Sequence, residues 1–290
     1  MVGQEPYDPN HVILPEIMKD NGYTTGMFGK WAGGYEGSVS TPDRRGIDEF
    51  FGYICQYQAH LYYPNFLNRF SKQAGDSAVR RIVLEKNIKH SMFGDDYFNR
   101  TQYSADIIHR EAMRWIERQT PGKPFFGLLT YTLPHAELAQ PHDSIYNHYK
   151  QKFFIDRTWG GNEGSRYNPA DHTHAHFAAM ITRLDTYVGE IVALLNLKNL
   201  YENTIIVFKR QRPSRGRRRR PQIFRARRQA ARTQAAMPGG RHSRAIHSVL
   251  ARTHATRQRQ PPPTGFLRRD AHIVRHHRRE KLRQTLRPQR

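Results

Sequence analysis

Three histidines and one cysteine are of types that could bind a metal ion or act as a nucleophile. His172, His174 and His176 alternate along the chain and could bind a metal ion. On a helix, however, alternate residues point about 200° apart, so we predict solvated histidines at a helix start. Cys55 is the only cysteine, which excludes a disulfide framework and argues against a thiolate metal cage. We predict that it is a buried small apolar residue, and we predict no metal site and no nucleophile here.

Lys30 and His135 lie at the ends of two apolar segments. His135 follows the apolar run Pro124–Thr132, and α/β sheets place ligand-binding loops after the carboxyl ends of their strands. Lys30 lies near the end of Tyr23–Trp31, which has strand character. Each residue also has a plain structural explanation, because a strand-end lysine can extend into solvent and His135 can be a surface histidine. These two residues alone leave both alternatives open.

Helical and strand patterns alternate along the first 208 residues. The predicted helices are Asn10–Asn21, Tyr103–Gln119 and Ala170–Leu197, and the predicted strands are Tyr23–Trp31, Pro124–Thr132 and Asn203–Phe208. We expect the second strand to be covered on both faces and the third to be buried. We expect residues 38–100 to form irregular aromatic loops over the sheet. The alternation predicts a layered α/β fold with crossover helices.

The composition changes abruptly at Lys209. Residues 209–290 hold 26 of the 47 Lys and Arg residues and two acidic residues, so they carry a net charge of +24 and residues 1–208 carry −2. The same segment has no Tyr, Trp or Asn and no sustained helical or strand period. We therefore predict a globular α/β domain over residues 1–208 and an Arg-rich disordered tail over residues 209–290.

The basic tail could bind nucleic-acid backbones, with strong salt dependence. It has only Phe224 and Phe266 for base stacking and shows no zinc, homeodomain or RNA-recognition pattern. An α/β domain with an Arg-rich nucleic-acid-binding tail stays an alternative, but we expect no specific nucleic-acid partner. No apolar run reaches the length of a membrane span, and the first ten residues lack signal-peptide features. We expect no membrane contact.

Four ordered segments carry a family resemblance. They are GYTTGMFGKWAGG (Gly22–Gly34), STPDRRGIDEFFGY (Ser40–Tyr53), PFFGLLTYTLPHAEL (Pro124–Leu138) and Ala178–Phe208. They resemble, in order and spacing, motifs of the arylsulfatase-type sulfatase family. The resemblance implies a fragment of an alkaline-phosphatase-like mixed sheet with helices on both faces. It also implies hydrolysis of sulfate esters, either aryl sulfates or sulfated glycans. A related phosphatase or phosphodiesterase is a further alternative, and GYTTGMFGKW argues against it.

The resemblance assigns roles to two residues. Lys30, in GKW, corresponds to a lysine that contacts the sulfate. His135, in Leu-Pro-His, matches the loop in which a histidine can bind sulfate oxygens or protonate the leaving alcohol. The family usually has a second histidine directly after GKW, where Ala32 stands. Either that contact is missing here or another residue supplies it.

Other family elements are missing from this sequence. The family's nucleophile is a formylglycine made from C/S-x-P-S-R, and no such motif is present. The early Asp pair that helps to bind calcium is also absent, so the resemblance implies a calcium enzyme whose ligands are not in this chain. We expect a chain that is truncated at both ends of the catalytic domain and is inactive. The parent enzyme would often be periplasmic or secreted.

The junction after Phe208 has an explanation in the genetic code. The family's next residues are T-S-D-N-G, whose Asp and Asn bind calcium, but KRQRP stands at Lys209–Pro213. The codons AAG CGA CAA CGG CCN encode those five residues, and a shift of one position reads AGC GAC AAC GGC, or Ser-Asp-Asn-Gly. The same shift permits the family's continuation over Gly240–Thr253. We interpret residues 209–290 as out-of-frame translation after a frameshift near Phe208.

Overall fold

The structure is a computed structural model that describes residues 5–84, 101–161, 167–209 and 247–250. All of them lie in one unit, residues 1–251. The helices are α1 (Leu14–Asp20), α2 (Ser104–Glu117), α3 (Ser144–Lys152) and α4 (Thr173–Leu197). The strands are β1 (Thr24–Lys30), β2 (Glu49–Tyr53), β3 (Phe66–Ser71), β4 (Arg80–Val83), β5 (Phe125–Thr130), β6 (Ile205–Phe208) and β7 (His247–Leu250). Short 3-10 turns include η1 (Pro42–Arg44), η2 (Gln58–His60) and η5 (Tyr201–Asn203).

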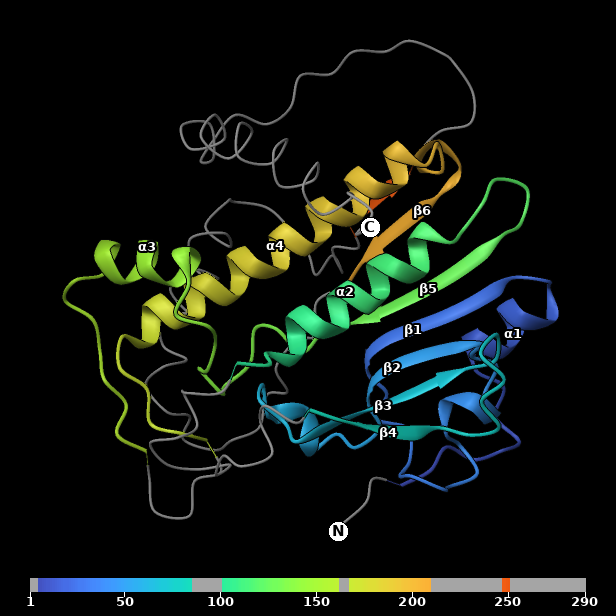
Figure 1. The fold of residues 1–290 in the computed structure, drawn as a ribbon, viewed down its shortest axis with the longest axis horizontal. Helices are drawn as coiled ribbons and strands as arrows, with labels where there is room; N and C mark the ends of the chain where they lie inside the picture. Colours follow the sequence, from blue (N-terminus) through green and yellow to red (C-terminus); the bar gives the residue numbers. More distant parts are fainter. Residues whose placement is uncertain (1–4, 85–100, 162–166, 210–246, 251–290) are drawn as a thin grey trace, which may run out of the picture. The chain divides into compact units, whose positions relative to one another are not determined.

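A mixed five-stranded sheet forms the centre of the fold, with the strand order β4-β3-β2-β1-β5 (Figure 1). Strand β1 pairs in parallel with β2 on one side and β5 on the other, whereas β3 and β4 continue the sheet in antiparallel fashion. The predicted α/β fold with a mixed sheet is therefore confirmed. Because β2, β1 and β5 are parallel, the residues that follow their carboxyl ends come to the same edge of the sheet.

Helix α2 packs closely on one face of the sheet because two glycines make room for a tryptophan. Gly26 of β1 and Gly127 of β5 are partners in the parallel register. A Cβ atom on Gly26 would lie 2.5 Å from the Trp115 ring, and one on Gly127 would lie 3.1 Å from it. Trp115 is buried with the apolar side of α2, and residues of α4 join the same core. Figure 1 shows α2 along β5 and β1 with α4 beside it.

The opposite face of the sheet has its own core near α1. Met27, Phe50 and Phe70 come from neighbouring strands and pack with Trp31, and Ile13 at the start of α1 packs against them. Apolar side chains therefore cover both faces of β1, which explains why its central residues are buried. Helices lie on both faces of the sheet, as the sequence predicts.

Residues 38–100 differ from the expectation of irregular loops, because they contain β2, β3 and β4. The pattern of β3 is hard to recognise because a polar residue occupies a buried position. Asn68 is 1 % exposed, and its side-chain amide donates to Glu36 at 2.6 Å. Arg81 of β4 binds the same carboxylate at 2.7 Å. These partners are distant in sequence, so periodicity alone does not reveal the strand. Helix α3 was also not predicted.

Two strands are less covered than the sequence suggests. Strand β5 is half-exposed and lies at an edge of the described sheet. Phe125 and Leu129 pack on one core and Leu128 on the core of the opposite face, so the predicted cover on both faces is present but partial. Strand β6 was expected to be buried, but Ile205 is 68 % and Val207 is 62 % exposed. It pairs with β7 in a separate two-stranded sheet, and Ile206 alone of its residues packs on the main core. Burial of these strands would need partners that the described residues do not provide.

The basic tail enters the described structure at only two places. Lys209 is exposed, and His247–Leu250 form β7, antiparallel to β6. Strand β7 departs from the expected absence of regular structure, since the four residues of β6 provide it with a pairing edge. The other residues of the tail lie outside the described residues. Within the described part of the chain, no helix has the length and apolar character needed to cross a bilayer.

Candidate functional site

The carboxyl edge of the parallel strands brings the candidate residues Lys30 and His135 to one side of the sheet. Lys30 ends β1, and His135 lies five residues after the end of β5. The two strands are direct neighbours, with Gly29 of β1 opposite Thr130 of β5. An open α/β sheet binds ligands beyond the carboxyl ends of such strands. The topology thus provides a reason for two residues 105 positions apart in the sequence to share a site.

The Lys30 side chain is half-buried and stands opposite Tyr53 of β2 in the parallel register. No hydrogen bond or ion pair links its ammonium group to any other residue that the structure describes. A half-buried cation without a carboxylate partner favours an anionic ligand, because Coulomb attraction is stronger where water is partly excluded. The position of Lys30 therefore fits an anion-binding role.

A cluster of aromatic and imidazole rings surrounds His135. The His60 ring lies 4.3 Å from the His135 ring, centroid to centroid, with the two planes at 71°. Tyr167 lies 6.0 Å from the His135 ring, and its hydroxyl is 2.9 Å from Nδ1 of His60. His60 ends the turn η2 after β2, so it also belongs to the carboxyl edge. The edge thus carries two adjacent imidazoles, which can bind anion oxygens and transfer protons.

A buried carboxyl group lies in the same loop as His135. Glu137 is 1 % exposed, and its Oε2 atom accepts a hydrogen bond from the backbone N–H of Asn168 at 3.2 Å. Burial raises the pKa of Glu137 from 4.5 to about 7, because the charged form loses its hydration. A protonatable carboxyl therefore lies beside the ring cluster.

The raised pKa of Glu137 predicts a pH-dependent stability. Between pH 4.5 and about 7 the folded chain keeps a proton that the unfolded chain releases, so stability should fall as the pH rises. A shift of this size corresponds to a loss of about 3 kcal/mol. We expect the variant Glu137→Gln, which cannot ionise, to lose this dependence. Urea unfolding of both proteins at several pH values, followed by tryptophan fluorescence, measures the difference.

The comparison with Glu137→Gln is needed because a second buried group, His176, changes the stability with pH in the opposite direction. Burial lowers the pKa of His176 from 6.5 to about 4, so its contribution to stability is lost as the pH falls below 6.5. The difference between the two proteins cancels this effect. Equal pH profiles for the wild type and the variant would show that Glu137 does not titrate as its burial implies.

One of the alternating histidines does not behave as predicted. His176 is fully buried, so the prediction of solvated histidines is wrong for that residue. His174 keeps 39 % of its side chain exposed, and its Nδ1 lies 2.5 Å from a carboxylate oxygen of Asp156. His172 precedes α4 in a left-handed conformation with φ of 47°. The Asp156 carboxylate also accepts hydrogen bonds from the first turn of α4. The Tyr146 ring packs on His176 with the ring centroids 4.5 Å apart, and the local spacing of the histidines could not reveal this cover.

Two further expectations concern metals and the nucleophile. No group of three or more His, Cys, Asp or Glu residues in the described ranges is arranged to hold a metal ion. Cys55 is half-buried rather than buried. It follows β2 at the same edge as His60, but its surroundings give it no assigned role.

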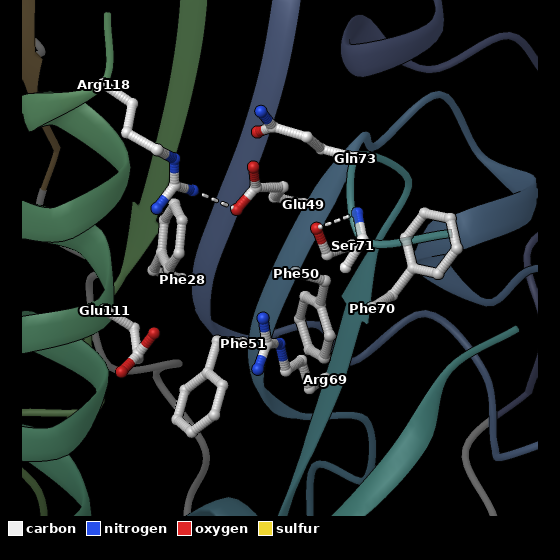
Figure 2. A pocket seen from close by; sticks show the side chains of 11 residues that line it. Phe28, Glu49, Phe50, Phe51, Arg69, Phe70, Ser71, Gln73, Glu111 and Arg118 are labelled. Atoms are coloured by element: carbon white, nitrogen blue, oxygen red, sulfur yellow. Dashed lines mark hydrogen bonds and ion pairs between the residues drawn. The ribbon is translucent and has the colours of Figure 1, made fainter. Parts of the chain in front are cut away.

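The hollow shown in Figure 2 lies away from this edge of the sheet. Its volume is about 240 Å³, and its walls include Glu49 at the amino end of β2 and Arg118 after α2, which form an ion pair at 2.5 Å. Ser71 and Gln73, from the end of β3, line it as well. Neither Lys30 nor His135 contributes to it, so this hollow is not the candidate anion site.

Comparison with known proteins identifies the family. The family model described as Sulfatase matches residues 3–209, which is more than two thirds of the chain. This chain belongs to the sulfatase family. The match ends at Lys209, the first residue of the basic tail, so the family relationship covers the α/β domain. The nucleic-acid-binding alternative receives no support from this match.

Individual sulfatases match the same part of the chain. Arylsulfatase J of Mus musculus is 26 % identical over 208 residues, which cover 70 % of this chain and 30 % of the mouse protein. The arylsulfatase of Klebsiella aerogenes is 22 % identical over 240 residues, or 71 % of this chain and 49 % of that protein. The chain thus spans less than half the length of these relatives. The crystal structure of Ps i-CgsB aligns with a TM-score of 0.46 at 23 % identity, covering 71 % of this chain and 41 % of that one.

Three residues of the candidate site, His60, Tyr167 and Glu137, are not predicted from the sequence. His60 could have been found, because it follows an apolar strand in the same way as His135, but β2 was not predicted. Tyr167 and Glu137 gave no comparable signal. Nothing in the local sequence around Glu137 indicates that its carboxyl is buried, and Tyr167 reaches His60 across 107 positions of the chain. Only the folded arrangement brings them together.

Proposed function

We propose that this chain carries the sulfate-binding edge of a sulfuric ester hydrolase. The complete enzyme would act on sulfate esters, either aryl sulfates or sulfated glycans. The ammonium of Lys30, which pairs with no other described residue and lies at an edge that also carries His135, is the observation that supports this proposal best. A sulfate ester presents oxygens that accept charge-assisted hydrogen bonds from such groups.

We propose that His60 supplies the second imidazole that the family usually carries directly after GKW. Ala32 occupies that place here and cannot bind an anion through its side chain. The His60 ring lies against His135 at 4.3 Å, so both imidazoles can face the same ligand. A histidine at this edge could protonate the leaving alcohol, and Lys30 could stabilise the charge that develops on the sulfate oxygens.

The described residues do not fit the calcium ion that we propose for the complete enzyme. Calcium takes six to eight oxygen ligands, mostly from carboxylates and carbonyls, and no cluster of acidic residues in the described ranges provides them. The chain also lacks C/S-x-P-S-R. We therefore propose that the 290-residue chain by itself hydrolyses no sulfate ester, and that a frameshift near Phe208 explains the sequence after it. Sequencing the DNA across the codons for Phe208 and Lys209 tests the frame.

Sulfate binding tests the proposed role of Lys30. We expect inorganic sulfate to shift the His135 ring resonances of the wild-type chain in a saturable manner. In Lys30→Met the dissociation constant should rise at least about tenfold, because one charge-assisted contact is removed. The measurement is an NMR titration at constant ionic strength, with chloride replacing sulfate in a parallel series.

The matched control is Lys123→Met, which removes an exposed lysine from the opposite edge of the sheet, just before β5. This variant should bind sulfate as the wild type does. Equal affinity in Lys30→Met and wild type would refute the assignment of Lys30. Turnover of 4-nitrophenyl sulfate by the purified 290-residue chain would refute its proposed inactivity.

A further inference from the structure

We propose that Tyr167 and Glu137 are positioning residues that fix the orientation of His60 against His135. The inference rests on the proposed function, because it concerns the imidazoles of the same sulfate-binding edge. The inference gives a role to Tyr167 and Glu137, to which the sequence motifs assign no role.

The first contact is between Tyr167 and His60. The Tyr167 hydroxyl is 2.9 Å from Nδ1 of His60, and the two rings are close to parallel at 17°, with their centroids 5.9 Å apart. A neutral imidazole has one donor and one acceptor nitrogen, and the hydrogen bond at one nitrogen sets the protonation of the other. A phenol is a better donor than acceptor, so Nδ1 accepts. The proton of His60 is then on Nε2, where it can be donated to a ligand oxygen.

The second contact holds the segment that carries Tyr167. Asn168 follows Tyr167 directly, is 2 % exposed, and donates its backbone N–H to Oε2 of Glu137. Glu137 belongs to the loop of His135, so its carboxyl joins that loop to the Tyr167 segment. A buried carboxyl is costly unless it is hydrogen-bonded, and breaking this bond would leave a buried polar group unpaired. Glu137 therefore restrains the position of Tyr167 relative to His135.

Several titratable groups face this arrangement. Tyr62 lies near Glu137 and Tyr167, and burial raises its pKa well above 10. It stays neutral at ordinary pH, and its hydroxyl donates to the Thr132 carbonyl at 3.3 Å. Among the described residues, the other titratable groups at this edge are His60, His135, Tyr167, Lys30 and Cys55. Glu137 can therefore change the charge next to two imidazoles, which links its protonation to the anion affinity of the site.

Tyr167→Phe and Glu137→Gln test the proposal in the full 290-residue chain. Tyr167→Phe keeps the ring and removes the hydroxyl. We expect the ¹⁵N ring shifts of His60 to move from the Nε2–H tautomer toward a mixture, even without sulfate. We expect the sulfate affinity of Tyr167→Phe to fall about fivefold relative to the wild type, because one neutral hydrogen bond is lost. Glu137→Gln keeps an acceptor for Asn168, so it should retain the His60 tautomer. Its sulfate affinity should fall less steeply than that of the wild type as the pH rises through 7, because only the contribution of Glu137 is removed.

The matched control is Tyr149→Phe, which removes a phenol that bonds Thr182 at 2.7 Å, away from the ring cluster. It should leave the His60 tautomer and sulfate affinity unchanged. An unchanged His60 tautomer in Tyr167→Phe would overturn the positioning role. A wild type that binds no sulfate, combined with an altered tautomer in Tyr167→Phe, would instead overturn the proposed function and leave the positioning role standing. Loss of sulfate affinity in all three variants alike would point to general destabilisation and also overturn the proposal.

Discussion

Replacing Gly52 with alanine is expected to abolish cooperative unfolding of the chain at 25 °C. Gly52 has φ of 156° and is the register partner of Gly29 in the parallel β1–β2 pair. A Cβ atom on Gly52 would overlap the carbonyl oxygen of Gly29. Both groups belong to the backbone, so only separation of the two central strands relieves the overlap. We expect a loss of more than about 4 kcal/mol, a large part of the 5–15 kcal/mol that stabilises a typical domain.

Gly37→Ala is the matched control for Gly52→Ala. Gly37 also has a positive φ, 82°, but a Cβ atom there would meet no atom within 4 Å. It should cost about 1 kcal/mol, the penalty for a left-handed backbone alone. Circular dichroism and urea unfolding measure both variants. A Gly52→Ala protein as stable as Gly37→Ala would mean that β1 and β2 do not pair as described. Because Lys30 follows Gly29 directly, the same change should also misplace the anion site.

Arg183→Leu is expected to lower the free energy of unfolding by about 3 kcal/mol. Arg183 of α4 is 7 % exposed in its side chain and binds Asp106 of α2 at 3.0 Å and Asp143 at the start of α3. Tyr187 donates its hydroxyl to Asp106 as well. Removing the guanidinium leaves two carboxylates without their cation, which costs about 3–5 kcal/mol for fully buried pairs. The two carboxylates are 39 % and 36 % exposed, so water offsets part of the loss.

Arg114→Leu provides the control for Arg183→Leu. Arg114 binds Glu111 at 2.6 Å on the surface of α2, with 59 % of its side chain exposed. Exposed pairs contribute less than about 1 kcal/mol, so this variant should unfold close to the wild type. Urea unfolding followed by tryptophan fluorescence compares the two. Similar small losses in both would show that Arg183 does not hold α2, α3 and α4 together.

The sequence determined the parts of this protein that depend on local pattern. The helix over Tyr103–Gln119 and the strands over Tyr23–Trp31 and Pro124–Thr132 lie where their periodicity predicts, within a few residues. The spacing of apolar residues that predicts a helix or a strand lies within one segment, so that segment alone is enough to predict the element. The motifs also identified the family and pointed to Lys30 and His135, since Lys30 ends one apolar strand and His135 follows another. Parallel pairing then brings such residues to one edge of a sheet.

Only the tertiary structure decided which side chains meet at that edge. His60 faces His135, Tyr167 bonds His60, and Glu137 is buried because distant segments cover it. The burial of His176 and the partners of Asn68 depend on long-range contacts in the same way. The burial of a polar group and the pKa that follows from it are set by everything that surrounds the group in space. Residues adjacent in sequence provide only a small share of those surroundings. The sequence pattern therefore predicted that Lys30 and His135 lie at the carboxyl edge of the sheet, but not that His60 and Tyr167 surround His135.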